Sequence, residues 1–350
     1  MRYVIMIVLV VAASLLLVFA RSPAPAPSAL QVPPPDGRNA ALKYWAAWTM
    51  LDTPTREKAI MAVDWDALGT ETDPDKLPAA FFEGASAIDA SLIEALIQAT
   101  SLRTCDFEID YENGFGALTP HLGGVMNTAR LLRLHARSRL VSGDVRRAGQ
   151  CVAAMYRLAA HVANDQVTIS GYTSFTIADR AHRETELLVA SGGLTAADRD
   201  SLVASIRWAD ESDPCGLKRG LASEQRWGMD WVIATFDGPD AGRRFLEFAH
   251  QGLIGGGGQR ANDMRSMDGA RLSREARRSR VMYDDILTAW DQPDAPERLK
   301  TIELGVVNGD YGALALAVAP TFCSFHEKDA TAKSARAKVL GLLEKAKVGP

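Results

Sequence analysis

Three consecutive stretches of helical periodicity between Thr119 and Gly193 constrain the fold of this chain more than any other feature. Apolar residues recur every three or four positions from Leu122 to Leu140, from Val145 to Val162 and from Ile169 to Leu188. Such spacing gives each helix one apolar stripe. Thr119 is expected to cap the first helix, with Pro120 at its first position. Short polar breaks that contain glycine or asparagine separate the stretches. The pattern therefore predicts three helices that pack against one another as hairpins.

Similar periodicity continues on both sides of this stretch. Further helices are expected at 39–51, 54–63, 78–99, 195–208, 217–236 and 239–253, after 271, and from 294 and 324 onward to 347. Trp45 and Trp48 of the first of these helices are expected in the core. Capping boxes are expected at 195–198, 294–297 and 324–327. The predicted fold class is all-α: stacked helical hairpins, either a tetratricopeptide-like α-solenoid or a helical bundle, behind an N-terminal hydrophobic segment.

One segment departs from the helical pattern. From Cys105 to Glu112, apolar and acidic residues alternate, which is the period of a β-strand. Carboxylates at this spacing could bind a hard cation such as calcium, but the segment lacks the Gly and Glu positions of an EF-hand loop. We expect an extended connector with a solvated acidic edge.

The N-terminus has the composition of an export signal. Arg2 precedes an uncharged run from Tyr3 to Ala20, and small residues before position 21 suit cleavage after Ala20. If it is not cleaved, the run is long enough to be a membrane anchor. We therefore expect a signal peptide or anchor at 1–20, a Pro/Ala-rich linker at 21–36, and one all-helical domain at 37–350.

Charge and cysteine content narrow the function further. A net charge of −4 argues against nucleic-acid binding, which usually requires a basic surplus. The four cysteines are far apart and form no CxxC motif, so neither a disulfide scaffold nor a zinc knuckle is expected, although an exported chain could oxidise one pair. Cys151 lies on a predicted helix, next to its buried apolar stripe, and is expected to be a packed thiol.

Several short motifs together resemble a known family. They are Asn39-Ala-Ala-Leu-Lys-Tyr-Trp, Cys105-Asp-Phe, Pro120-His-Leu and Gly143-Asp144. Residues 39–193 thereby resemble a family of exported, helical proteins of planctomycete-type bacteria. The resemblance implies an all-helical body outside the cytoplasm and brings no catalytic residues with it. The small residues around Gly143 are also similar to the turn of a tetratricopeptide hairpin.

A run of four glycines begins at Gly255, and polar residues follow it. Ordering consecutive glycines costs about 1–2 kcal/mol of backbone entropy per residue. The two methionines in this segment offer little apolar surface to offset that cost. We expect residues 255–269 to form a mobile loop.

Candidate chemistry is limited to carboxylate and histidine side chains. Two carboxylate-x-x-His pairs occur, Asp179/His182 and Glu247/His250, and this spacing puts both side chains on one helix face. The best location for a metal site combines Asp179, His182 and Glu186 with two residues of the preceding helix. These two residues are His161 and Asp165. A buried, hydrogen-bonded polar cluster is the competing and stronger interpretation.

These observations lead to two alternative functions. The first is an exported helical scaffold that binds a protein or envelope partner, with no predicted cofactor. It would contact a membrane only through an uncleaved N-terminal segment. The alternative is an envelope-associated hydrolase or metal-dependent enzyme that uses His and carboxylate residues. The sequence assigns no catalytic residue.

Overall fold

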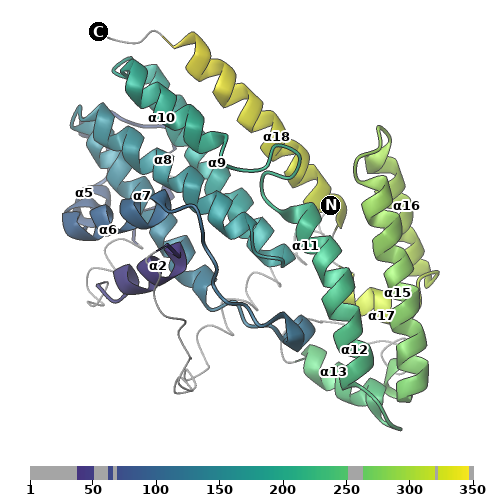
Figure 1. Ribbon diagram of the computed structural model, residues 1–350. Helices are drawn as coiled ribbons and strands as arrows, with labels where there is room; N and C mark the ends of the chain where they lie inside the picture. Colours follow the sequence, from purple (N-terminus) through teal and green to yellow (C-terminus); the bar gives the residue numbers. More distant parts are fainter. Residues whose placement is uncertain (1–37, 51–61, 66–68, 251–262, 320–321, 347–350) are drawn as a thin grey trace. The chain divides into compact units, whose positions relative to one another are not determined.

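The computed structural model describes residues 38–50, 62–65, 69–250, 263–319 and 322–346 (Figure 1). The predicted signal or anchor at 1–20 and the linker at 21–36 lie outside these ranges. Within them the regular structure is helical, and the only β-type pairing is an isolated bridge between Asn39 and Thr104. This confirms the all-α fold class. No helix in the described ranges combines the length and apolar character needed to cross a membrane.

The described helices succeed one another along the chain. In order they are α2 (Ala40–Trp48), η1 (Pro74–Lys76), α5 (Ala79–Ser86), α6 (Ala90–Ser101), η2 (Tyr111–Gly116), α7 (His121–Val141), α8 (Val145–Ala163), α9 (Thr168–Ser191), α10 (Ala196–Ile206), α11 (Leu217–Ser223), η3 (Glu224–Gly228), α12 (Met229–Thr235), α13 (Ala241–His250), α15 (Gly269–Ala289), α16 (Ala295–Asn308), α17 (Ala313–Val318) and α18 (Phe322–Lys345).

Contacts group these helices into two compact units, where the sequence predicts one domain over 37–350. Among the described residues, unit 1 contains 112–115 and 225–323, and unit 2 contains 38–111, 116–224 and 324–346. The chain thus leaves and re-enters unit 2. The candidate site lies in unit 2.

The three central helices of unit 2 match the three predicted stretches. The Asp144 side chain accepts a hydrogen bond from the Arg147 amide and caps α8, and Gly192 ends α9 in the left-handed conformation at φ 71°. The predicted Thr119 cap of α7 is wrong, because α7 begins at His121 with Pro120 in the cap position and no side-chain cap bond. Proline at the boundary still fits, since it lacks an amide proton.

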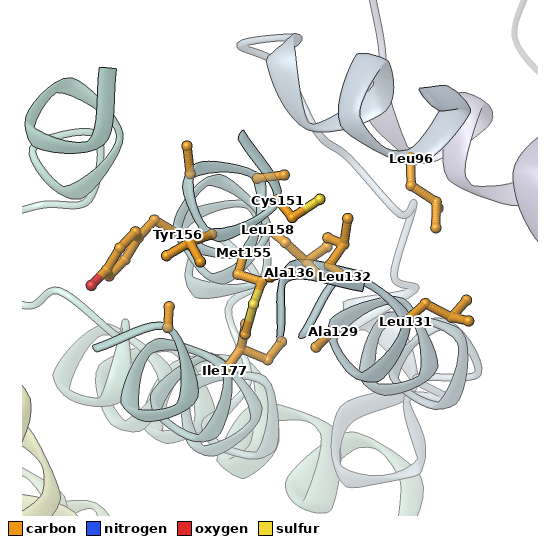
Figure 2. Close-up of a cluster of buried hydrophobic side chains, with 14 of the residues drawn as sticks. Leu96, Ala129, Leu131, Leu132, Ala136, Cys151, Met155, Tyr156, Leu158 and Ile177 are labelled. Atoms are coloured by element: carbon orange, nitrogen blue, oxygen red, sulfur yellow. The ribbon is translucent and has the colours of Figure 1, made fainter. Parts of the chain in front are cut away.

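Helix α8 is the centre of the hydrophobic core of unit 2. It contacts α6, α7, α9 and α10, and its buried residues lie on nearly all sides of the helix. Figure 2 shows Met155 and Leu158 of α8 near Leu132 of α7 and Ile177 of α9, all of which are buried. Many of its other buried residues are alanines, which allow neighbouring helices to approach closely. Cys151 is buried here as a free thiol, as predicted.

Two predictions of apolar packing need correction. Ile169, assigned to the stripe of α9, is 38% exposed, because the buried face of the first turn is made by Thr168, Ser170 and Gly171 instead. Trp45 is 42% exposed rather than in the core, whereas Trp48 packs on the core and donates a hydrogen bond to Thr128 Oγ1 at 2.9 Å.

The alternating segment at 105–112 does not form a strand in the structure. Glu108 has a φ of 55°, which breaks the extended geometry, and its amide donates to the Asp106 carboxylate at 2.8 Å. Tyr111 then begins the 3₁₀ turn η2. No neighbouring strand supplies a ladder among the described residues, so the alternation has nothing to pair with.

Two of the three predicted capping boxes are wrong. The box at 195–198 is present with both reciprocal hydrogen bonds. At 294–297 the Asp294 side chain makes no cap bond, because it pairs with Arg298 at 2.8 Å. At 324–327 the residues lie inside α18, which already begins at Phe322.

Two predictions fall in unit 1. The segment expected as one helix at 217–236 contains a π turn, η3, where unit 2 ends and unit 1 begins. The first part of the predicted mobile loop, 255–262, lies outside the described residues. Its second part differs from a mobile loop: Met264 and Met267 are buried, and the Gly242 amide donates to the Met267 carbonyl at 2.9 Å.

Candidate functional site

His161 is held in a buried hydrogen-bonded position near the end of α8. Its Nε2 lies 2.8 Å from the Leu102 carbonyl oxygen, and its Nδ1 lies 2.9 Å from the Tyr44 hydroxyl. A carbonyl can only accept, so Nε2 carries the proton and Nδ1 accepts from Tyr44. Burial lowers the pKa of His161 to about 4. The ring is therefore neutral at pH 7, with both nitrogens engaged by the protein.

Asp165, one turn further along the chain, pairs with a different histidine. Its Oδ2 accepts a hydrogen bond from His121 Nε2 at 2.8 Å, and both side chains are buried. The His121 ring stacks on Phe107 with 4.1 Å between centroids. The predicted pairing of Asp165 with the residues of α9 is replaced by this contact with α7.

The three candidates on α9 point to separate partners. Asp179 forms an ion pair with Arg183 at 2.9 Å, and Glu186 forms one with Lys338 at 2.6 Å. His182 is buried between them, and its Nδ1 has no hydrogen-bond partner. Burial lowers the pKa of His182 to about 4.

The five predicted site residues therefore do not converge on one point. In the described ranges, no three His, Cys, Asp or Glu side chains are grouped so that they could hold a metal ion. In the second carboxylate-x-x-His pair, Glu247 accepts from Arg243 at 2.6 Å, and the side chain of His250 lies outside the described residues. The alternative interpretation, buried hydrogen-bonded polar groups, describes His161 and Asp165 well.

A group of charged residues that no sequence motif singled out lies between α7 and α9. We call it the arginine cluster. It consists of Arg130, Arg133, Arg137, Arg180 and Arg183. Arg133 and Arg137 are both buried, as is Glu184 of α9, which lies between them. The positions 130, 133 and 137 are three and four residues apart, so α7 presents these side chains on one face.

Glu184 is the acidic centre of this group. Its Oε1 accepts from Arg133 Nε and from Arg137 Nη2, each at 2.8 Å, and its Oε2 accepts from Arg137 Nε, also at 2.8 Å. Arg137 thus binds the carboxylate in the bidentate geometry that guanidinium groups favour. Its remaining Nη1 donates to the Glu71 carbonyl at 2.8 Å. Arg137 and Glu184 are fully occupied by protein groups.

Arg133 and Arg180 are less completely satisfied. Arg133 uses only Nε for Glu184, and its guanidinium lies 4.0 Å above the Trp65 ring. Arg180 is partly buried, and in the part of the chain that the structure describes it makes no hydrogen bond and no ion pair. Burial lowers the pKa of Arg180, and the neighbouring charges of Arg133 and Arg130 lower it further. Such a group is the kind of donor that binds an anion.

A second, partly buried carboxyl group lies at the start of α9. Glu224, the first residue of the π turn, accepts a hydrogen bond from the Thr168 amide at 2.8 Å. This bond satisfies one of the free amides of the helix start. Burial raises the pKa of Glu224 to about 7. The carboxyl group serves as a cap for α9 from a distant part of the sequence.

The sequence contained one usable signal for the arginine cluster. Three arginines at 130, 133 and 137 fall on one face of a helix that has no acidic residue, so any neutralising carboxylate had to come from another helix. Comparison with known proteins adds no further signal: no protein-family model matches this chain, and neither a curated protein nor a solved structure is significantly similar to it.

Proposed function

We propose that this chain is an exported helical scaffold that binds a partner outside the cytoplasm. The observation that carries this proposal is that four of its five candidate acid–base side chains form hydrogen bonds or ion pairs within the protein. His161, Asp165, Asp179 and Glu186 each hold a fixed partner within the protein. Groups used in this way stabilise a rigid helical body, and a rigid body suits a protein that presents a binding surface.

The place of action is part of the same proposal. The charged start, the apolar run to Ala20 and the proline-rich stretch after it support export, with the folded part held away from a membrane or a cleavage site. The resemblance of residues 39–193 to exported helical proteins agrees with this location. We further propose that α7, α8 and α9 pack as stacked hairpins in the tetratricopeptide-like manner, since each contacts the other two.

A second function is favoured by one specific observation. The buried Nδ1 of His182 has no hydrogen-bond partner, and a neutral imidazole with an open nitrogen is a potential general base or metal ligand. This supports the alternative of an envelope-associated hydrolase or metal-dependent enzyme. Asp179 and Glu186, on the same face, would have to exchange their present ion pairs to join it.

The two proposals are separated by cross-linking and turnover measured on the same material. The full chain carrying a C-terminal tag is cross-linked in living cells of its native host, and cross-linked peptides are identified by mass spectrometry. The scaffold proposal predicts one recurrent partner, linked equally by the wild-type chain and by His182→Gln. Absence of a recurrent partner, together with turnover of ester or phosphoester substrates that His182→Gln abolishes, would instead support the enzyme.

A further inference from the structure

The arginine cluster carries an excess of positive charge in a chain whose net charge is negative. The charged groups that interact with Arg133 and Arg180 are three further arginines and two carboxylates, Glu184 and Asp179. Among the described residues, these five guanidinium groups and two carboxylates sum to three positive charges. The whole chain has a net charge of −4, so this surplus is a local feature of α7 and α9.

Neither of the two carboxylates forms an ion pair with Arg180. Glu184 is saturated by its three hydrogen bonds from Arg133 and Arg137. Asp179 is paired with Arg183, whose side chain is 64% exposed, at the outer edge of the cluster. Among the described residues Arg180 therefore has no carboxylate partner of its own, and the charges that act on it most strongly are those of Arg133 and Arg130.

Donor groups remain available near Glu184, because Arg180 lies one helical turn before Glu184 on α9 and Arg133 is bonded to it. Neither Nη nitrogen of Arg133 has a hydrogen-bond partner among the described residues, because only its Nε reaches Glu184. Arg180 contributes its whole guanidinium group. The stacking of Arg133 on Trp65 and its bond to Glu184 fix the orientation of its donors before any ligand arrives. Preorganised donors lose less entropy when a ligand binds.

Like charges in a partly desolvated position are unfavourable unless an anion compensates them. A guanidinium group offers parallel N–H donors that match the two oxygen atoms of a carboxylate or a phosphate group. The ammonium group of a lysine lacks this planar pair of donors. The geometry and the charge both favour an oxygen-rich anion.

We propose that the arginine cluster is a binding site for an oxyanion, a phosphate, sulfate or carboxylate group of a ligand or partner, held between Arg180 and the two Nη nitrogens of Arg133. This inference rests on the proposed binding function and specifies the chemistry that the partner presents. Arg130 and Arg183 lie at its edge, and Glu184 with Arg137 forms the rigid floor.

Isothermal titration calorimetry on the full chain tests this proposal. Sodium phosphate, sulfate and acetate are titrated separately at constant ionic strength, with chloride as the background anion. We expect saturable binding of one anion per chain, weakened at least about tenfold by Arg180→Gln, because charge-assisted hydrogen bonds to the anion are lost. Preference for phosphate and sulfate over acetate would identify a tetrahedral ligand group, and the reverse would identify a carboxylate.

Arg199→Gln is the matched control. It removes one arginine of the same chain from α10, where Arg199 pairs with its neighbour Asp200, and it changes the net charge equally. We expect its affinity to stay within about twofold of wild type. Circular dichroism melting of Arg180→Gln establishes that the variant is folded, which is expected because Arg180 makes no hydrogen bond and no ion pair with the described residues that the substitution would break.

Two results would overturn the inference: no saturable heat with any of the three anions, or equal losses in Arg180→Gln and Arg199→Gln. Failure here is distinguishable from failure of the proposed function. If the cross-linked partner is retained in full by Arg180→Gln while no anion binds, the scaffold proposal stands and the oxyanion site is wrong. If anions bind as expected but no partner recurs, the site stands and the scaffold proposal is wrong.

Discussion

Replacing Glu184 by glutamine should test the packing of α7 against α9 more severely than any other single change. Glutamine keeps the volume of the side chain but has one acceptor oxygen and an added NH₂ group. Three hydrogen bonds at 2.8 Å end on the Glu184 carboxylate, and at least one guanidinium would then face a donor. Both arginines would also lose the carboxylate that compensates their buried charge.

The expected cost follows from that loss. Removing one member of a buried ion pair leaves an uncompensated charge and costs about 3–5 kcal/mol. Folded domains are stable by only about 5–15 kcal/mol, so Glu184→Gln should remove a large part of the stability of unit 2. Glu186→Gln is the control on the same helix. Glu186 pairs with Lys338 at 2.6 Å, but these side chains are 40% and 62% exposed, so the cost should stay below about 1 kcal/mol.

Amide hydrogen exchange is the suitable assay because the chain contains two compact units. Global denaturation of such a chain need not be two-state, whereas exchange reports the opening free energy of α7 and α9 directly. Glu184→Gln should accelerate exchange in both helices by two to three orders of magnitude relative to Glu186→Gln, on the order expected from the energy difference. If the two variants differ by less than about 1 kcal/mol, the carboxylate is not the electrostatic centre that the geometry indicates.

The remaining predictions concern pH and individual hydrogen bonds. The folded-state pKa values of His161 and His182 are about 4 and lie below the unfolded value of about 6.5. The stabilising contribution of each histidine should therefore be fully present above pH 6.5 and should fall by about 1.4 kcal/mol per pH unit as the pH drops toward 4. Urea unfolding at several pH values measures this loss. The pKa shift of Glu224 has the opposite sign, because its folded-state pKa is raised to about 7. Glu224→Gln should therefore raise the free energy of unfolding by about 1–2 kcal/mol at pH 8 and leave it unchanged at pH 4. Equal effects at the two pH values would contradict the raised pKa. Tyr44→Phe should cost about 1–3 kcal/mol in chemical denaturation, since it leaves a buried imidazole nitrogen without its donor, and a neutral result would mean the bond is not formed. Thr195→Ala should cost about 1 kcal/mol by the same assay, with helical content lost near α10, unless the capping box contributes nothing.

The central helices could be predicted because their signals are local. The apolar spacing, the Asp144 cap of α8 and the Gly192 stop of α9 act within a few residues, so the sequence is sufficient to read them. The segment at 105–112 shows the limit of the same reasoning. Its alternation matches a strand, but a strand also needs a partner, and pairing is a property of the whole fold.

The arginine cluster was missed for a related reason. Charged residues on a predicted helix are usually solvated, and nothing near Arg133 or Arg137 in the sequence indicates burial. Their burial depends on Glu184, which lies 47 residues after Arg137 and on another helix. The predicted metal site was wrong for the reverse reason: residues that are close in sequence do not act together in the structure. His161 and Asp165 are close in sequence, but Tyr44 and His121 from other helices engage them separately.

The oxyanion site is tested most directly by a crystal structure of the chain soaked in selenate, read by the anomalous scattering of selenium. We predict an anomalous peak at the arginine cluster, with selenate oxygens about 2.7–2.9 Å from the guanidinium nitrogens of both Arg133 and Arg180. No peak there while selenate occupies other sites, or an Arg180 guanidinium already bound to a protein carboxylate, would contradict it.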